Sequence, residues 1–358
     1  MKRIESLQSV TIFSKLKLVM EGQIYKIHSD LYHVQYGDCS CECKIREVLK
    51  KQREKILVGD FVEFDNGVIS KILPRKTFIK RPAVANVDQI VVVSAVKHPD
   101  LDFHQLNRYI ALAKYYKIPA ILCFNKEDLG LDLTAHDKII SIYEPLGYKV
   151  LFTSALEKKG INEFRKVLEG KVSALCGNSG VGKSSLINAL NPNLNLKTKA
   201  VSEKLNRGTH TTRHCEIIKL DSKSSIVDTP GFSNVKFDFL LPQDVDLLFE
   251  EMLQYREYCK YGDCLHINED GCEVLKNIEQ IDETRYESYV EFVNEAIEYK
   301  EKIKYNGRKV ETSQKFKDNK VYVKISEKKR QASRNTRKQM IYKEIDEHAD
   351  EWLYWAGK

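Results

Sequence analysis

A glycine-rich loop between an expected strand and an expected helix restricts the fold of this chain more than any other feature. Residues 177–184 read GNSGVGKS, which matches the pattern G-x-x-x-x-G-K-[ST]. The apolar run VSALC precedes the loop and the helical run SLINAL follows it. Backbone N–H groups in such a loop approach phosphate oxygens, and a helix N-terminus favours an anion. The sequence therefore predicts an α/β domain that binds a nucleoside triphosphate, since an incidental glycine turn needs no such context.

The phosphate loop is joined by a second motif, Asp228-Thr229-Pro230-Gly231, which follows the expected strand SSIV. Lys183 is expected beside the β- and γ-phosphates, and Ser184 is expected to ligate Mg²⁺. Asp228 would hold the same Mg²⁺ through water, and the N–H of Gly231 would sense the γ-phosphate. The predicted phosphate-binding residues are Gly177, Asn178, Ser179, Gly180, Val181, Gly182, Lys183, Ser184, Ser185, Asp228 and Gly231.

A guanine-reading motif is expected at Asn125-Lys126-Glu127-Asp128, after the strand AILCF. Its aspartate would accept the N1–H and N2–H donors of guanine, a pair that adenine does not offer. By itself N-K-x-D is usually a surface turn, but Ser154-Ala155 after the next strand supplies the matching loop, whose backbone N–H meets guanine O6. The predicted ligand is GTP or GDP, bound through Asn125, Lys126, Glu127, Asp128, Ser154 and Ala155.

The order of these motifs is unusual. In ordinary GTPases the phosphate loop comes first and the guanine motif last, whereas here the guanine motif at residues 125–128 precedes residues 177–184. A compact domain tolerates this rearrangement because its termini usually lie close together at the surface. We therefore predict a circularly permuted GTPase domain.

The residue that orients the attacking water must lie outside the Asp-Thr-Pro-Gly motif. Position 232 is Phe232, where Ras-like proteins carry a glutamine. Residues 207–214 (RGTHTTRH) stand where switch I belongs, and within them His210 is the candidate to position water and Thr212, or else Thr211, to ligate Mg²⁺. A structural or RNA-contacting histidine is the alternative for His210. Arg213 and His214 are interpreted as a solvated start of a strand.

The nine cysteines suggest metal binding and burial. Cys259, Cys264, His266 and Cys272 form a Cys₃His set, which would close a tetrahedral shell around one structural Zn²⁺ per chain. Three further cysteines alternate in one strand and are interpreted as barrel interior rather than a second metal site: Cys39, Cys41 and Cys43. The remaining three are expected in the core: Cys123, Cys176 and Cys215.

The length of 358 residues predicts more than one domain. Short alternating runs from Gln23 to Leu73 indicate a five-stranded barrel. Strands are then expected at 90–96, 120–124, 150–153, 172–176, 215–220 and 225–228 in a mostly parallel sheet covered on both faces, with a helix at 105–117. After about residue 235 the pattern indicates helices without strands, with a last helix near 339–353. The chain shows no secretion signal and no membrane-length apolar run, so we expect a cytoplasmic monomer.

Positive charge is concentrated near the C-terminus. Residues 301–340 hold 14 Lys and Arg against 4 Asp and Glu, whereas residues 1–300 are balanced at 42 against 42. Such a run is often only a solvated tail, but its isolation in an otherwise neutral chain favours RNA contact. A smaller basic group in the expected barrel would serve the same purpose: Arg46, Lys50, Lys51, Arg53 and Lys55.

The permuted motifs, the barrel and the Cys/His cluster together resemble the RsgA (YjeQ-type) family of ribosome-assembly GTPases, over about residues 20–300. The resemblance implies an OB-fold RNA-binding barrel at 1–78, a circularly permuted GTPase domain at 79–236 and a zinc-binding helical domain at 237–300, with 301–358 as a basic extension. It also implies binding to the small ribosomal subunit and its rRNA late in maturation, with hydrolysis stimulated by that subunit. The family pattern G-[RQ]-H-T-T is similar to residues 208–212, except that Thr209 replaces Arg or Gln. A nucleotide-gated RNA-binding module with incidental hydrolysis is the alternative.

Overall fold

The computed structural model describes residues 19–51, 55–194, 196, 215–228, 237, 240–305, 314–317, 320–323 and 334. For Lys50, Lys51, Asp228 and residues 302–305, 314–317 and 320–323 it describes backbone alone. Several predicted features lie outside the described residues: His210, Thr212, Gly231, Arg53 and the helix near 339–353.

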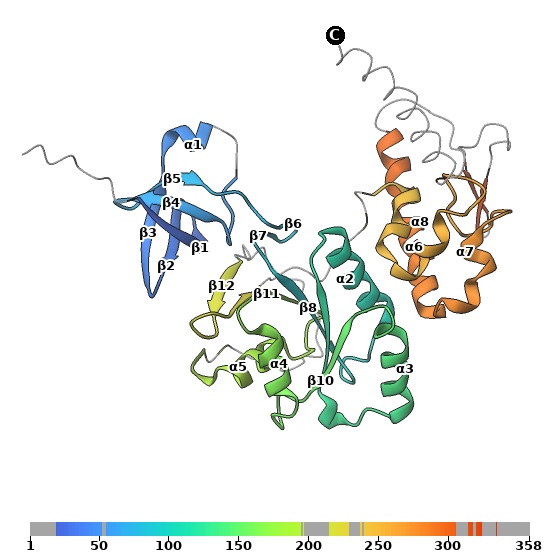
Figure 1. Cartoon of the computed structure of the whole chain (residues 1–358), viewed down its shortest axis with the longest axis horizontal. Coiled ribbons are helices and arrows are strands. Elements are labelled where there is room, and N and C mark those ends of the chain that lie inside the picture. The colour runs from blue at the N-terminus through green and yellow to red at the C-terminus, as the bar shows by residue number, and fades with distance from the viewer. Residues whose placement is uncertain are drawn as a thin grey trace, which may run out of the picture.

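The N-terminal part is a closed five-stranded barrel (Figure 1). Its strand order is β1-β2-β3-β5-β4, and β4 pairs back onto β1. The β3–β5 pair is parallel and the other neighbours are antiparallel, which is the topology of an OB-fold. The predicted barrel is thus confirmed. Its elements are β1 (Met20–His28), β2 (Leu31–Tyr36), β3 (Cys39–Ile45), α1 (Glu47–Lys51), β4 (Phe61–Asp65) and β5 (Val68–Ile72).

The prediction that all three barrel cysteines face the interior is wrong. Cys43 is fully buried, Cys41 is half-buried and Cys39 is exposed. The reason is that β3 starts directly at the β2–β3 turn, so its first residues extend beyond the packed interior formed by Ile24 and Phe64.

A six-stranded sheet forms the centre of the molecule, in the order β10-β9-β8-β11-β13-β12. All neighbours are parallel except β12, an antiparallel edge strand. The predicted strands are therefore confirmed. They are β8 (Gln89–Ala95), β9 (Ala120–Asn125), β10 (Lys149–Thr153), β11 (Val172–Cys176), β12 (Glu216–Lys219) and β13 (Ser225–Asp228), preceded by the small hairpin β6 (Phe78–Lys80) and β7 (Ala83–Ala85).

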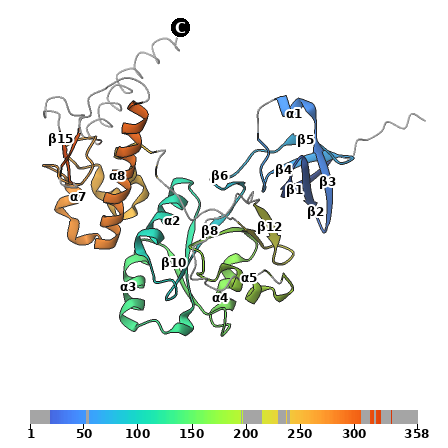
Figure 2. The ribbon, with the colours of Figure 1, turned by 180° about the vertical axis from the view of Figure 1, so that it is seen from behind.

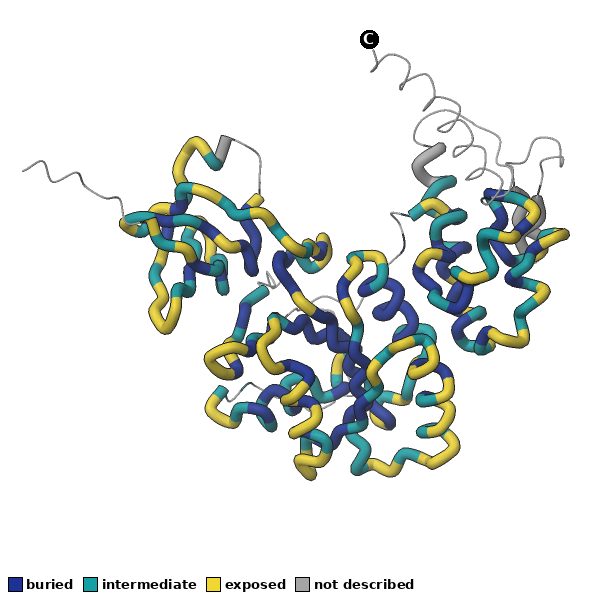
Figure 3. Tube along the Cα trace, viewed as in Figure 1, coloured by how far each residue is buried: buried dark blue, intermediate teal, exposed yellow. Residues whose placement is uncertain are grey.

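Helices cover both faces of this sheet, because successive side chains of a strand point to opposite faces. Ile90 and Val92 of β8 pack with α2 and α3, whereas Val91 and Val93 pack with α4 and α5. Buried residues accordingly follow the central strands in Figure 3. The elements are α2 (Phe103–Tyr115), η1 (Glu127–Leu129), α3 (Leu133–Tyr143), α4 (Ile161–Leu168), α5 (Lys183–Leu190) and η2 (Pro192–Leu194), with η marking 3₁₀ turns.

The barrel and the central sheet are joined edge to edge. Strand β1 pairs with β12 at Lys26 and Glu216, and the ammonium of Lys26 lies 3.0 Å from a carboxylate oxygen of Glu216. Lys219 of β12 also donates to the carbonyl oxygen of Gly37 in the barrel. Strand β12 is thus one point of contact between the barrel and the central sheet.

Helices around a second core make up the C-terminal part, and they lie on the opposite side of the central sheet from the barrel in both views (Figures 1 and 2). They are η4 (Pro242–Leu248), α6 (Glu250–Arg256), α7 (Glu273–Lys276), η5 (Ile278–Gln280) and α8 (Glu283–Tyr305). The expectation that strands stop after residue 235 is wrong, because β14 (Gln314–Lys317) and β15 (Lys320–Val323) form an antiparallel hairpin. Within the described residues no helix is both long and apolar enough to cross a membrane.

Polar contacts fix α8 against α2. Asn107 donates to Ser288 at 2.9 Å, and Arg108 pairs with Glu291 at 2.7 Å and with Glu295 at 2.8 Å. Arg108 is largely buried, so its pairs are less screened by water than those at an open surface. Helix α2 therefore connects the central sheet to the C-terminal helices.

Candidate functional site

The phosphate loop lies where the direction of strand addition reverses. From β8 the chain adds β9 and β10 on one side, and then returns to β11 on the other side of β8. In open α/β sheets, ligands bind at such a switch point, outside the carboxyl ends of the strands. Residues 177–182 leave β11 at this point and lead into α5. The topology thus supports the sequence motif independently.

Two glycines are required by the packing of the loop. A Cβ at Gly177 would lie 2.0 Å from the carbonyl oxygen of Val93, and one at Gly182 would lie 2.2 Å from Nδ2 of Asn125. Both glycines also have positive φ angles, of 141° and 96°. Any side chain at either position would push the loop away from the adjacent strands.

Lys183 folds back over the loop. Its ammonium donates to the carbonyl oxygens of Gly177 at 2.7 Å and Asn178 at 2.9 Å. These two carbonyl groups hold the ammonium beside residues 177–182, the loop that is predicted to bind phosphate. That Lys183 faces the β- and γ-phosphates stays a prediction.

Asn125 connects three separate loops. Its buried amide donates to the carbonyl oxygen of Val181 at 2.9 Å, and its Oδ1 accepts from Thr153 Oγ1 and from the N–H of Ala155, each at 3.2 Å. The sequence interpretation gave Asn125 a direct role with the base, and the geometry gives it a bridging role between base loops and phosphate loop. The N–H of Ala155 donates to Asn125 here, and the direct roles of Asn125 and Ala155 with the base stay predictions.

Asp128 is oriented by the second base loop. Ser154 Oγ donates to the Asp128 carboxylate at 2.5 Å and accepts from the N–H of Glu157 at 3.0 Å. Lys126 adopts a left-handed backbone with φ of 67°, and its ammonium donates to the carbonyl oxygen of His98. Glu127 pairs with Lys159 at 2.7 Å, and both are surface positions. Of the predicted guanine residues, Ser154 thus contacts the Asp128 carboxylate directly, whereas Lys126 and Glu127 contact His98 and Lys159.

Tyr109 is a loop contact that the sequence interpretation missed. Its hydroxyl donates to Oδ1 of Asn178 at 3.2 Å, from the buried face of α2. No sequence motif indicates Tyr109, because a tyrosine on the buried face of a helix has the same spacing as an ordinary core residue. Through Tyr109, the helix that contacts α8 also contacts the phosphate loop.

Asp228 is the last residue of β13, beside β11 in the parallel register Ala174 to Val227. Its backbone therefore reaches the same edge of the sheet as the phosphate loop. The remaining predicted members, Thr212, His210 and Gly231, lie outside the described residues.

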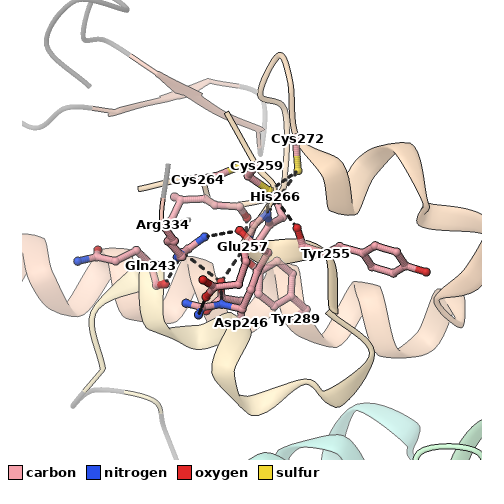
Figure 4. Close-up of polar contacts among 12 residues, drawn as sticks. Gln243, Asp246, Tyr255, Glu257, Cys259, Cys264, His266, Cys272, Tyr289 and Arg334 are labelled. Atoms are coloured by element: carbon pink, nitrogen blue, oxygen red, sulfur yellow. Dashed lines mark hydrogen bonds and ion pairs between the residues drawn. The ribbon is translucent and has the colours of Figure 1, made fainter. Parts of the chain in front are cut away.

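The four predicted metal ligands come together in the C-terminal helices (Figure 4). One ligand atom from each of Cys259, Cys264, His266 and Cys272 lies within 4.8 Å of every other, and all four residues are buried. Cys259 Sγ lies 3.9 Å from Cys272 Sγ, and His266 Nδ1 lies 3.5 and 3.3 Å from these sulfurs. A tetrahedral zinc ion would separate two sulfurs by about 3.8 Å, and sulfur from nitrogen by about 3.5 Å. The donor set therefore fits Zn²⁺.

Asp246 supports the histidine from behind. Its Oδ2 lies 3.0 Å from His266 Nε2, which leaves Nδ1 to face the sulfurs. Metal-bound histidines are commonly held in this way by a carboxylate. Burial lowers the pKa of His266, but hydrogen bonds to Asp246 and two thiols raise that pKa overall, and a metal bound at Nδ1 would displace the proton there. Asp246 lies outside the Cys/His pattern, so no motif indicates its role.

Comparisons with known proteins agree with this geometry. The profile of the RsgA GTPase family matches residues 72–238, and that of the RsgA N-terminal domain matches residues 21–68. Two curated relatives carry the name "Small ribosomal subunit biogenesis GTPase RsgA". The protein of Agathobacter rectalis is 38% identical over 290 residues, covering 75% of this chain and 96% of the relative. That of Bacillus cereus is 40% identical over 290 residues, covering 78% and 98%.

Two solved structures share the fold. YjeQ from Thermotoga maritima has a TM-score of 0.68 at 34% identity and covers 78% of this chain and 99% of its own. YloQ, described as a circularly permuted GTPase, has a TM-score of 0.66 at 30% identity and covers 78% and 96%. The permuted arrangement inferred from motif order is thus seen in a related structure.

Proposed function

Because this chain belongs to the RsgA family of GTPases, it is a GTP-hydrolysing enzyme, and we propose that it acts as a late checkpoint in assembly of the small ribosomal subunit. In this proposal the GTP-bound protein binds the subunit and its rRNA in the cytoplasm, and the subunit stimulates hydrolysis. The names of the curated relatives support the ribosomal role. The observation that carries the proposal is the convergence of Asn125, Ala155 and the phosphate loop at one sheet edge.

The nucleotide roles follow from the chemistry of these residues. Asp128 accepts two donors from guanine, Lys183 pairs with the β- and γ-phosphates, and loop N–H groups cradle the phosphate oxygens. Mg²⁺, held by Ser184 and Thr212 and through water by Asp228, would neutralise charge on the phosphates. Asn125 contributes by fixing the base loops relative to the phosphate loop.

Hydrolysis would rely on the segment before β12. Phe232 has no group that can orient water, so His210 takes that role in the proposal. A neutral imidazole accepts a hydrogen bond from water near physiological pH. His210 would reach the γ-phosphate when the subunit orders this segment, which accounts for stimulation by the subunit.

Two connections could carry the nucleotide state to the binding surfaces. Strand β12 pairs with the barrel through Lys26 and Glu216, and it links residues 197–214 to the strand that ends at Asp228. On the other side, α2 contacts Asn178 through Tyr109 and contacts α8 through Arg108. Both outer parts are thus attached to elements next to the phosphates.

Measuring GTP turnover with and without purified small ribosomal subunits tests the proposal, with large subunits as the control. We expect small subunits to raise turnover well above the large-subunit control. Equal turnover in all three conditions would contradict the checkpoint role and favour a nucleotide-gated RNA-binding module. Filter binding with a non-hydrolysable GTP analogue and with GDP then tests the nucleotide-dependent binding that both functions require, so stimulated turnover is the result that separates them.

The guanine assignment predicts a change of base preference in Asp128→Asn. The amide offers a donor where the carboxylate accepted two, so affinity for GTP should fall and preference should shift toward xanthosine triphosphate. Competition titrations with a fluorescent guanine nucleotide measure both affinities. Asp137→Asn is the matched control, since it makes the same change at an exposed carboxylate of α3, outside the predicted guanine-binding residues. Unchanged base preference in Asp128→Asn would refute the assignment.

The zinc assignment predicts one structural zinc ion per chain, held by Cys259, Cys264, His266 and Cys272. Cys264→Ser should lose this zinc and loosen the C-terminal helices, because cysteine ligands belong to the core that holds those helices together. Elemental analysis and limited proteolysis measure the two effects. Cys41→Ser removes a thiol in the barrel and should keep full zinc. Zinc retained by Cys264→Ser, or lost by Cys41→Ser, would contradict the assignment.

A further inference from the structure

Arg334 belongs to the basic stretch near the C-terminus, yet its side chain inserts beside the metal cluster (Figure 4). One guanidinium nitrogen lies 3.1 Å from Asp246 Oδ2 and donates to the carbonyl oxygen of Gln243 at 3.2 Å. The other terminal nitrogen donates to the carbonyl oxygen of Arg256 at 3.2 Å. The side chain is 12% exposed. Three acceptors from two elements therefore hold a residue that lies far from them in sequence.

The acceptor of the ion pair is the carboxylate that supports His266. Asp246 Oδ2 lies 2.7 Å from Arg256 Nε, 3.0 Å from His266 Nε2 and 3.1 Å from a guanidinium nitrogen of Arg334. Its other oxygen, Oδ1, is buried without a hydrogen-bond partner among the described residues. A buried carboxylate is costly unless it is paired. The two guanidinium groups that stabilise this buried charge therefore both contact Oδ2, the oxygen that also faces His266.

We propose that Arg334 is a positioning residue for the zinc site, acting through Asp246. With two guanidinium groups hydrogen-bonded to it, Asp246 Oδ2 stays directed at His266 Nε2, so that Nδ1 faces the metal. Without Arg334, Arg256 still pairs with Asp246, so the site should weaken rather than collapse. Partners behind metal ligands typically change metal affinity by about 10- to 100-fold. Because Arg334 is one step further from the ion, we expect about tenfold faster zinc release.

The inference rests on the zinc site proposed above, and the experiment keeps the two apart. The full chain, loaded with zinc, is mixed with an excess of a colorimetric chelator, and zinc transfer is followed over time. Wild type without one equivalent of transferable zinc would defeat the zinc proposal itself. Given that zinc, Arg334→Ala should release it about tenfold faster, and Arg334→Lys, which keeps the charge but not the fork of donors, should lie between the two. Arg330→Ala removes one charge from the same basic stretch and is the matched control.

A double-mutant cycle distinguishes positioning through Asp246 from a general loss of stability. In an Asp246→Asn background, Arg334→Ala should add no further acceleration, because the charged acceptor is already gone. The absorption bands of Co²⁺-substituted protein should also shift in Arg334→Ala and in Asp246→Asn, but not in Arg330→Ala. Release from Arg334→Ala within twofold of Arg330→Ala would overturn the inference. Additive effects of the two substitutions, or an unshifted Co²⁺ spectrum, would overturn it as well.

Discussion

Lys183→Ala is expected to weaken GTP binding by about 30-fold to several thousandfold, because truncating one partner of a hydrogen-bonded charge pair costs about 2–5 kcal/mol. In the structure the ammonium of Lys183 is within 3 Å of two loop carbonyls, which holds it at the mouth of the loop. A triphosphate would replace these neutral acceptors with charged ones, whereas alanine offers no donor. Isothermal titration with a non-hydrolysable GTP analogue measures the loss.

Lys223→Ala is the matched control for this prediction. Lys223 is an exposed lysine just before β13, at the end of that strand opposite Asp228. Its removal deletes the same charge far from the loop, and GTP affinity should stay within about twofold of wild type. Circular dichroism should show that both variants remain folded. If Lys183→Ala bound GTP with the same affinity as wild type, the loop at residues 177–184 would not be the phosphate site.

The central strands could be predicted because burial on both faces gives them continuous apolar runs. The run Ile90–Val93 is buried throughout, and its alternate residues serve two different cores. Helix α2 was also foreseen within two residues at each end, since its buried face repeats at helical spacing. In the barrel, the alternation of apolar and polar residues predicted the strands but wrongly placed Cys39 in the interior. The alternation does not show where along a strand the packed interior ends.

The nucleotide site could be located from motifs, but its internal contacts could not. The pattern N-K-x-D identifies Asn125 without showing that its amide bonds to Val181, some fifty residues further along the chain. Asp246 and Arg334 belong to no spacing rule, because their contact with the Cys/His cluster arises from tertiary packing. The Lys26–Glu216 pairing between barrel and sheet has the same origin. Short sequence patterns therefore predict secondary-structure elements and ligand-binding residues. Contacts between residues far apart in the sequence become evident only in the three-dimensional structure.

His210→Ala is expected to lose most subunit-stimulated turnover while keeping its affinity for GTP. Phe232 cannot orient water, so a side chain from the segment before β12 has to do so, and His210 is its candidate. Removing a water-positioning or general-base group typically costs about 10² to 10⁴-fold in rate. Affinity should be unaffected, because the base is read at Asp128 and the phosphates are held by the loop. Single-turnover hydrolysis on small subunits, alongside a GTP titration, measures the two effects.

His214→Ala supplies the comparison for His210→Ala, since it removes an imidazole four residues away that is interpreted as solvated. It should keep stimulated turnover near that of wild type. The His210 variant, by contrast, should stay on the subunit with GTP bound, because release is expected to follow hydrolysis, and sucrose-gradient sedimentation detects that accumulation. If the stimulated turnover of His210→Ala stayed within about threefold of wild type, catalysis by this histidine would be ruled out. Removing a general base lowers the rate by far more than that. Thr212 together with a group supplied by the RNA would then be the explanation to test.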